Sequence, residues 1–306
     1  MITIFAPAGI GEVEVGADLA ALVASAVGSH PEGPLRDGDI VVITSKIVSK
    51  AEGRVASAAE REPAIEAETA RTVARRDPTR IVRTTRGLTL AAAGVDNSNV
   101  AQGSILLLPT DPDRSAHRLR DELTARSGVR LGVLISDTAG RPWRVGQTDH
   151  AIGAAGITVV ERYTGSWDQY GNSLQITAMA VGDELAAAAD LVKGKLSRLP
   201  VAVIRGLDRV VIDDAENATS LLRPDPADLF RYGSREAVLA AVLEATGQAG
   251  RFEELVGLGQ DELVAAVLSG CDLPSQVADL LMRILIAADG SGNASFRGRT
   301  APGDPG

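Results

Sequence analysis

The chain has 306 residues, of which 45% are hydrophobic and only 3% aromatic, so its length allows one large domain or two smaller ones built on aliphatic cores. Its net charge of −9 argues against nucleic-acid binding, which usually requires a basic face. The single cysteine, Cys271, excludes an intramolecular disulfide and a cysteine-built zinc site. No apolar run approaches the length of a membrane helix, and the first residues lack a basic leader region, so we expect a cytoplasmic protein.

Apolar periodicity and capping residues predict alternating strands and helices, which is typical of an α/β protein. In chain order we predict a strand at 2–6, a helix at 19–27, a strand at 40–43, a helix at 63–76, strands at 81–83, 88–92, 104–108, a helix at 112–126, a strand at 131–135, a strand ending at 160, a strand at 174–181, a helix at 183–191, a strand at 201–204, and helices at 252–269 and 274–288. The sequence pattern changes near residue 245, beyond which only amphipathic helices and a Gly/Pro-rich stretch are predicted. This change predicts a main domain at 1–245 and a helical extension at 246–306 that ends in a disordered Gly/Pro-rich tail over 289–306.

Polar side chains follow directly after three of the apolar strands. Ser45 and Lys46 follow the strand at 40–43, Asp96 follows the strand at 88–92, and Asp137 follows the strand at 131–135. Open α/β sheets bind ligands at the carboxyl ends of their strands. We therefore expect these three junctions to form one site.

The junction after residue 135 is the most crowded of the three and is expected to be a polar loop. Its polar residues are Asp137, Thr138, Arg141, Arg144, Gln147, Asp149 and His150, with Gly140 and Gly146 as bends. The alternative interpretation is a loop whose charges only pair with one another. A similar alternative applies to the segment from Asp96 to Asn99, which is also a good turn sequence.

Lysine is rare in this chain, with four lysines against 27 arginines. The four are Lys46, Lys50, Lys193 and Lys195, in two close pairs. A compact ammonium group and a guanidinium group are not equivalent as phosphate partners. The pairs therefore indicate phosphate contacts, with chance clustering as the alternative.

Several common motifs are absent from the sequence. There is no GxxxxGK[ST], no GxGxxG after a strand, no HExxH and no GxSxG, and the three histidines are scattered. What remains is Asp96 and Asp137 with Thr138 beside them. Two carboxylates and a hydroxyl suit a hard divalent cation, Mg²⁺ or Mn²⁺, that also binds substrate phosphates. The set predicts metal-assisted phosphoryl transfer.

Five ordered blocks together resemble the coenzyme F420-0:L-glutamate ligase family. They are GIGE at 9–12, DGDIVVITSKIVSKAEGR at 37–54, AAAGVDNSNV at 91–100, ISDTAGRPWRVGQTDHAIGAAGI at 135–157 and DELAAAADLVKGK at 183–195. The resemblance implies a mixed α/β (α+β), two-lobed fold that is neither P-loop nor Rossmann, and a homodimer. It implies GTP-dependent formation of an amide between F420-0 and L-glutamate through an acyl phosphate, with further γ-linked glutamates as an extension. The resemblance does not extend to flavin chemistry in this chain, because residues 246–306 are too short for a flavin-binding domain.

The resemblance also implies roles for individual residues. The metal ligands would be Asp96, Asp137 and Thr138, for Mg²⁺ or Mn²⁺, with K⁺ as a candidate second cation. The nucleotide contacts would be Ile10, Gly11, Glu12, Val13, Ser45, Lys46, Lys50, Asn99, Lys193 and Lys195. Many members have glutamine at the position of Lys195, where the alternatives are a lost metal contact or a direct phosphate contact.

The catalytic set predicted from these residues is Lys50, Asp137, Arg141 and Arg144. The lysine would stabilise phosphoryl oxygens, and the two arginines would bind substrate carboxylate or phosphate groups. Two rival functions remain at this point. One is a metal-dependent nucleotide phosphohydrolase, and the other is a non-catalytic nucleotide-binding scaffold whose acids and lysines are paired surface charges.

Overall fold

The structure is a computed structural model that describes residues 1–76, 78–213, 215–269 and 274–288. The chain forms two compact units. The first contains residues 1–69 and 84–224, and the second contains residues 70–83 and those from 225 onward. Within the described residues, no helix combines the length and the apolar character that crossing a membrane requires.

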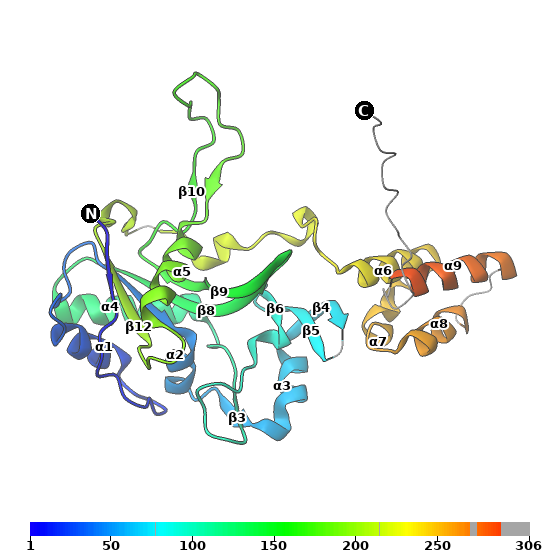
Figure 1. Cartoon of the computed structure of the whole chain (residues 1–306), viewed down its shortest axis with the longest axis horizontal. Coiled ribbons are helices and arrows are strands. Elements are labelled where there is room, and N and C mark those ends of the chain that lie inside the picture. The colour runs from blue at the N-terminus through cyan, green and yellow to red at the C-terminus, as the bar shows by residue number, and fades with distance from the viewer. Residues whose placement is uncertain (77, 214, 270–273, 289–306) are drawn as a thin grey trace, which may run out of the picture. The chain divides into compact units, whose positions relative to one another are not determined.

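A five-stranded sheet forms the centre of the first unit (Figure 1). Its strands, in spatial order, are β1 (Thr3–Phe5), β12 (Val201–Arg205), β2 (Ile40–Thr44), β8 (Gly132–Arg141) and β9 (Arg144–Ala155). Strands β2 and β8 are parallel, whereas the other three pairings are antiparallel. This mixed sheet confirms the predicted mixed α/β fold and differs from the parallel sheet of a Rossmann domain.

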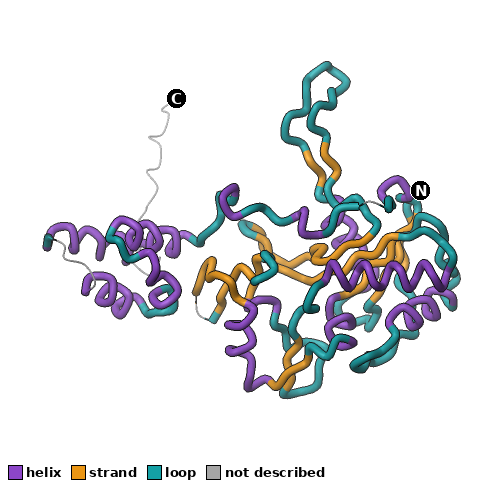
Figure 2. Tube along the Cα trace, turned by 180° about the vertical axis from the view of Figure 1, so that it is seen from behind, coloured by secondary structure: helices purple, strands orange, loops and turns teal. Residues whose placement is uncertain are grey.

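Helices cover both faces of this sheet because its central strands are apolar on both sides. Val41 and Ile43 of β2 face a core shared with α1 (Leu19–Gly28) and α4 (Pro112–Ser127). Ile40 and Val42 alternate to the opposite core, which is shared with α5 (Val181–Lys193). Figure 2 shows the sheet from behind, with helices lying across it.

Side-chain caps begin both α1 and α4. The Asp18 side chain accepts a hydrogen bond from the Ala21 amide at 2.9 Å, and the Asp111 side chain accepts one from the Arg114 amide at 3.1 Å. Gly128 ends α4 with φ of 72°, a conformation that favours glycine. These features explain why the predicted helices at 19–27 and 112–126 are confirmed.

Strands β8 and β9 form one long hairpin, so the predicted polar loop over 137–150 is wrong. Asp137 pairs with His150 and Thr138 with Asp149, and the ladder continues to Arg141 and Arg144. Backbone pairing between two strands holds these polar residues extended, which a single-strand pattern does not reveal. Because β9 ends at Ala155, the strand predicted to end at residue 160 is also displaced.

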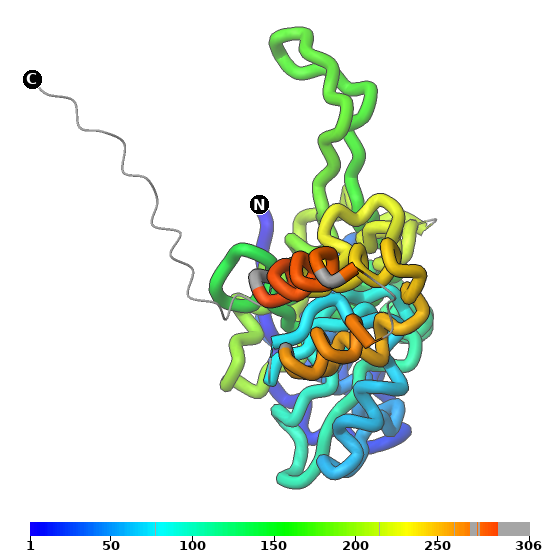
Figure 3. The backbone as a smooth tube through the Cα atoms, turned by 90° about the vertical axis from the view of Figure 1, so that its right-hand side faces the viewer, coloured from blue at the N-terminus to red at the C-terminus, as the bar shows by residue number. Residues whose placement is uncertain are grey.

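The smaller elements of the first unit flank this sheet. They are α2 (Ser45–Ala51), β3 (Val55–Ser57), α3 (Arg61–Glu68), β6 (Thr89–Ala91) and β7 (Ser104–Leu106). Strands β10 (Glu161–Arg162) and β11 (Ala178–Met179) form the base of a long arm, which Figure 3 shows from a second side. The predicted strand at 174–181 is therefore reduced to two residues. Trp167, Tyr170 and Ile176 are exposed on the arm.

The second unit contains most of two strands, β4 and β5, and a group of helices. Its elements are β4 (Thr69–Arg76), which begins one residue before it, β5 (Thr79–Thr84), which ends one residue beyond it, α6 (Ser234–Ala245), α7 (Phe252–Leu255), α8 (Gln260–Ser269) and α9 (Ser275–Ala288). The predicted helix at 63–76 is wrong beyond Glu68. Strand β4 pairs with β5, and two distant residues also bond it: the Thr72 amide donates to Glu253, and the Val73 carbonyl accepts from the Gly233 amide.

The boundary between the units differs from the predicted domain boundary at 245/246. Leu239 and Leu243 of α6 pack with Phe252, Leu255 and later residues in one apolar cluster. Residues 225–245 therefore belong by packing to the second unit. The predicted disordered tail at 289–306 lies outside the described residues.

Candidate active site

Four segments meet at one end of the five-stranded sheet, where the central strands β2 and β8 reach their carboxyl ends. We call this end of the sheet the site edge. Strands β2 and β8 are parallel, so Thr44 and Ser136 lie side by side where the two strands reach this edge. Strand β12 enters from the same edge, where the Thr44 amide donates to the Pro200 carbonyl at 2.9 Å, and β1 runs towards it. The predicted nucleotide segments at 10–13, 45–50 and 193–200 are therefore directed to one place.

Ser45 and Asp137 are the first predicted site residues that this register brings together. The Ser45 hydroxyl donates a hydrogen bond to Asp137 Oδ1 at 2.6 Å. Ser45 is buried, so its hydroxyl requires a partner, and Asp137 supplies one. The contact links the start of α2 to β8.

Lys46 extends the cluster to Asp96. Its ammonium forms an ion pair with the Asp96 carboxylate and donates to the Ser98 hydroxyl at 3.0 Å. Ser98 in turn donates to Asp96 through its amide at 2.9 Å and through its hydroxyl at 2.6 Å. Backbone hydrogen bonds between Asp96 and Leu106 hold this segment in place. The three strand-end junctions predicted from the sequence thus form one cluster.

The two carboxyl groups of this cluster have opposite electrostatic properties. Burial raises the pKa of Asp137 to about 6, against the lowering effects of the Ser45 hydrogen bond and the Lys46 charge. Burial alone would also raise the pKa of Asp96, but hydrogen bonds from Lys46 and Ser98 outweigh it and lower the pKa to about 2. The charges of Asp96 and Asp149 add to the rise at Asp137, because both lie near it.

We expect the Asp137→Asn variant to be more stable than the unsubstituted protein near neutral pH when no divalent cation is present. The pKa of Asp137 is about 6 in the folded chain, whereas an aspartate in an unfolded chain has a pKa of about 3.9. The native state therefore binds this proton more tightly, and its stability relative to the variant falls as pH rises from about 4 to about 6. The deficit above pH 6 should be about 2–3 kcal/mol.

Urea unfolding with a chelator present, at pH 4 and at pH 7.5, measures this difference. The asparagine oxygen still accepts from Ser45, so the change removes mainly the buried charge. A free-energy difference between the two proteins that is the same at both pH values would contradict the assignment.

Lys50 lies one helical turn beyond Lys46 and connects α2 to the predicted nucleotide loop. Its ammonium forms an ion pair with Glu12; the Lys50 side chain is 11% exposed and that of Glu12 is 78% exposed. In the same loop Ile10 and Val13 are buried. Gly11 and Glu12 are exposed. This arrangement leaves the loop backbone anchored by its apolar residues and its polar part open to a ligand.

A second polar cluster lies on the other side of the hairpin. The Asp149 carboxylate accepts hydrogen bonds from Ser136 and from Thr138, both at 2.7 Å, and pairs with the Lys193 ammonium at 2.8 Å. Burial opposes ionisation of Asp149, but the charge and hydrogen bond of Lys193 outweigh it and lower its pKa. Because alternate residues of a strand face opposite sides, Ser136 and Thr138 face Asp149 while Asp137 faces Ser45.

The sequence interpretation did not assign a role to Asp149 or Ser136. One available signal was the spacing of the small hydroxyl residues Ser136 and Thr138, two apart on one strand face. The pairing with Asp149 depends on the hairpin register, which includes a bulge between Ile135 and Ser136. Bulges often occur next to functional sites, where they redirect side chains.

Four of the predicted site residues lie apart from these clusters. Arg141 and Arg144 pair at the end of the hairpin, four residues beyond Asp137, which is about 13 Å along an extended strand. Lys195 and Asn99 are exposed, and Asn99 has φ of 60°. Arg144, Lys195 and Asn99 are open to a ligand, whereas Arg141 is partly buried, and the roles assigned to all four stay predictions.

The donor atoms around Asp137 fit a hard divalent cation bound together with phosphate oxygens. The Asp96 charge raises the pKa of the Asp137 carboxyl group. The Lys46 ammonium pairs with Asp96, and its charge lowers the pKa of Asp137. Among the described residues, no three His, Cys, Asp or Glu side chains form a ready metal site. Mg²⁺ typically binds proteins through one or two carboxylates and completes its shell with water and substrate phosphates. The residues present match that requirement.

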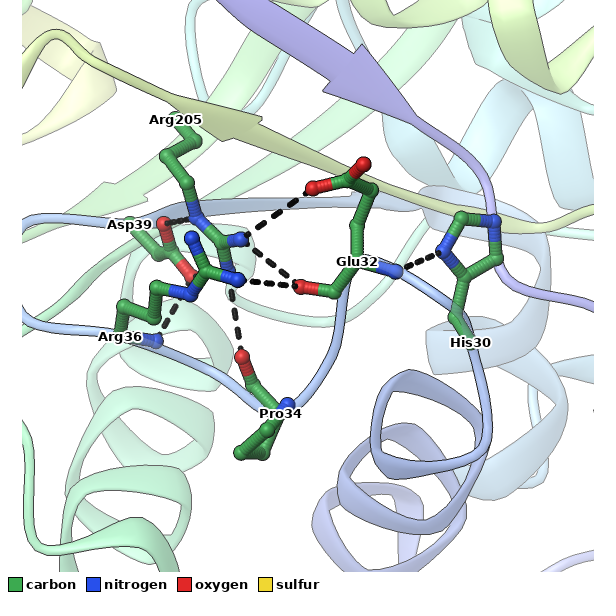
Figure 4. A network of polar contacts seen from close by, with 6 residues as sticks. All are labelled: His30, Glu32, Pro34, Arg36, Asp39 and Arg205. Atoms are coloured by element: carbon green, nitrogen blue, oxygen red, sulfur yellow. Dashed lines mark hydrogen bonds and ion pairs between the residues drawn. The ribbon is translucent and has the colours of Figure 1, made fainter.

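The polar network drawn in Figure 4 serves a structural purpose. Arg205 donates to both oxygens of the fully buried Asp39, at 2.8 and 2.7 Å, and to the Glu32 and Pro34 carbonyls. Asp39 precedes β2 and Ser45 follows it, so this network lies about 20 Å along the strand from the site edge. It closes the opposite end of the sheet.

Comparisons with known proteins identify the family of the chain. Residues 9–206 match the family described as F420-0:gamma-glutamyl ligase, a range that includes β2, β8 and β12 at the site edge. The chain is 39% identical over 250 residues, 75% of its length, to the coenzyme F420:L-glutamate ligase of Methanothermobacter thermautotrophicus, covering 99% of that protein. It is 38% identical over 242 residues, 72% of its length, to the enzyme of the same name from Methanopyrus kandleri, covering 94% of it. The chain therefore belongs to the F420-0:gamma-glutamyl ligase family.

Proposed function

We propose that this chain is a GTP-dependent ligase that joins F420-0 to L-glutamate through an amide bond in coenzyme F420 biosynthesis. The observation that carries the proposal is the cluster of Ser45, Lys46, Asp96 and Asp137 at the one edge where the family-matched segments meet. The relatives are named coenzyme F420:L-glutamate ligases, which supports the proposed substrates. Addition of further γ-linked glutamates is an extension of the same reaction.

The proposed reaction has two steps, and the side chains at the site edge support it. An F420-0 carboxylate oxygen attacks the γ-phosphorus of GTP, GDP leaves, and an acyl phosphate forms. The glutamate amine then attacks the acyl carbon, phosphate leaves, and the nitrogen loses a proton. Lys46 and Lys50 stabilise the negative phosphoryl oxygens, because each ammonium lies beside the site edge with an acidic partner it can exchange for phosphate.

Asp96, Asp137 and Thr138 would hold the divalent cation, Mg²⁺ or Mn²⁺, and K⁺ is a further candidate cation. When bound, the cation neutralises charge on the phosphate oxygens. Arg141 and Arg144, at the open end of the hairpin, bind carboxylate groups of the substrates by paired N–H donors. Ser45 holds Asp137 in position through its hydroxyl.

Three other proposals accompany this function. We assign the ligase activity to residues 1–245 and propose that the chain acts in the cytoplasm. We also propose a homodimer, which the exposed apolar side chains of Trp167, Tyr170 and Ile176 on the arm support. Light scattering in solution would measure the assembly, and a monomeric mass would contradict it.

Mass spectrometry of a reaction containing F420-0, GTP, L-glutamate and Mn²⁺ tests the proposal. We expect a product heavier than F420-0 by one glutamyl residue, formed together with GDP and only when all three substrates are present. Rapid GTP consumption without F420-0 or glutamate would instead indicate a phosphohydrolase. Calorimetry that detects no metal-dependent GTP binding would indicate a scaffold, and either result would overturn the proposed ligase.

A further inference from the structure

Asp149 and Lys193 form an ion pair in the interior of the first unit. Each side chain is only 4% exposed, and the Lys193 ammonium also donates to the buried Ser136 hydroxyl at 2.9 Å. Two charges removed from water cost free energy, and hydrophobic residues of similar size often stabilise a core as well or better. The pair therefore requires an explanation beyond packing, and its burial sets Lys193 apart from the exposed Lys195.

The pair controls the hydroxyl group of Thr138. An ionised carboxylate can only accept hydrogen bonds, so in the contact of 2.7 Å between them Thr138 is the donor and Asp149 the acceptor. A threonine hydroxyl has a single proton. Once that proton is directed at Asp149, the oxygen presents only lone pairs to other groups, which is the state that a cation ligand requires.

The same pair is connected to the loop that precedes β12. Lys193 is the last residue of α5, and its carbonyl accepts a hydrogen bond from the Ser197 hydroxyl. One chain of contacts thus runs from the loop at 194–200 through Lys193 and Asp149 to Thr138. The loop and β8 come from segments far apart in sequence, and this buried pair joins them at the site edge.

We propose that Asp149 and Lys193 are positioning residues that orient the Thr138 hydroxyl as a ligand for the divalent cation. Lys193 neutralises Asp149 and holds it in place, and Asp149 takes the Thr138 proton. This inference rests on the proposed function, because it requires a cation at the end of β8 that Asp137 reaches from one face of the strand and Thr138 from the other. It assigns Lys193 to this buried role and not to direct contact with the nucleotide.

Binding of Mn²⁺ alone, followed by the electron paramagnetic resonance signal of free Mn²⁺, tests the inference without any turnover. The variants are Thr138→Val, the neutral pair Asp149→Leu/Lys193→Met, and the combination of all three substitutions. We expect Thr138→Val and the neutral pair each to weaken Mn²⁺ binding about 10-fold or more. The combination should bind no more weakly than Thr138→Val, because the pair acts only through that hydroxyl.

Two outcomes would overturn the inference. The neutral pair could retain the original Mn²⁺ affinity, or it could cost as much affinity in the Thr138→Val background as it does alone. If the neutral pair does not fold, the same measurements use it with Ser136→Ala added, which removes the buried hydroxyl left without its acceptor. Circular dichroism establishes that each variant is folded.

The pair Asp39 and Arg205 provides a matched control, since it is a second largely buried ion pair at the opposite edge of the same sheet. Asp39→Leu/Arg205→Met should change the melting temperature but not the Mn²⁺ affinity. An equal loss of affinity would attribute the effect to general destabilisation and overturn the inference.

Asp137→Asn separates the inference from the proposed function. If this variant binds Mn²⁺ as the unsubstituted protein does, or if neither binds it, the cation site itself is wrong and the inference falls with it. If Asp137→Asn loses binding but the neutral pair does not, only the positioning role is wrong.

Discussion

The Asp137→Ala variant should ligate glutamate to F420-0 at least about 100-fold more slowly than the unsubstituted protein while it remains folded. The Asp137 carboxylate accepts the hydrogen bond from Ser45, and the charges of Lys46 and Asp96 act on it. Loss of charge stabilisation in a phosphoryl-transfer transition state typically costs about 3 kcal/mol or more, which corresponds to this change in rate. The measurement is the initial rate of product formation at saturating GTP and Mn²⁺.

A matched acidic residue shows whether the loss is specific. Asp121 is exposed on α4, away from the site edge, and Asp121→Ala should retain the original rate. Thermal unfolding of Asp137→Ala without divalent cations should remain cooperative, because removal of a buried charge offsets the loss of the acceptor for the Ser45 hydroxyl. Turnover by Asp137→Ala within a few-fold of the original rate would contradict the assignment of Asp137 as a catalytic, metal-binding residue.

The meeting of Ser45 and Asp137 could be predicted because it depends on a rule that local sequence reveals. Each follows a short apolar run, and runs that are buried on both faces favour neighbouring strands of a covered sheet. Once β2 and β8 are parallel neighbours, their ends must coincide. Caps such as Asp18 act within one helical turn, so the helix at 19–27 could be predicted in the same way.

The second cluster could not be predicted because its members meet only through pairing at a distance. Asp149 reaches Thr138 through the register of the β8–β9 hairpin, and Gly140 and Gly146 in that segment favour a loop when taken alone. Lys193 comes from the end of α5, 44 residues beyond Asp149. Its rarity marked it as functional, but rarity does not show whether a lysine is buried against an acid or exposed to phosphate.

The second unit shows the same limit in its secondary structure. The segment at 69–76 is polar enough to continue α3, yet it is a strand because it pairs with β5, and Glu253 and Gly233 bond further backbone groups of it. Glu253 and Gly233 lie more than 150 residues away, so local preference could not identify these two contacts. The packing of α6 against later helices displaced the domain boundary for the same reason.

The single substitution Lys193→Met should be the most destabilising of the changes considered, lowering the free energy of unfolding by about 3–5 kcal/mol at neutral pH. Methionine has a similar length but no charge, so the buried Asp149 carboxylate would lose its counter-ion while it stays out of water. Urea unfolding monitored by circular dichroism measures the loss. The exposed Lys195, two residues further along the chain, gives the matched control Lys195→Met, which should change stability by no more than about 0.5 kcal/mol.

Adding Asp149→Leu to Lys193→Met should restore most of this stability, because no charge then remains buried. That recovery would separate the role of the ion pair in stability from its role at Thr138, since the neutral pair is expected to fold and still to bind Mn²⁺ weakly. A Lys193→Met protein as stable as Lys195→Met would show that the Lys193 ammonium is not the counter-ion of Asp149 in solution. The chain of contacts from the loop at 194–200 to Thr138 would then have no buried ion pair at its centre.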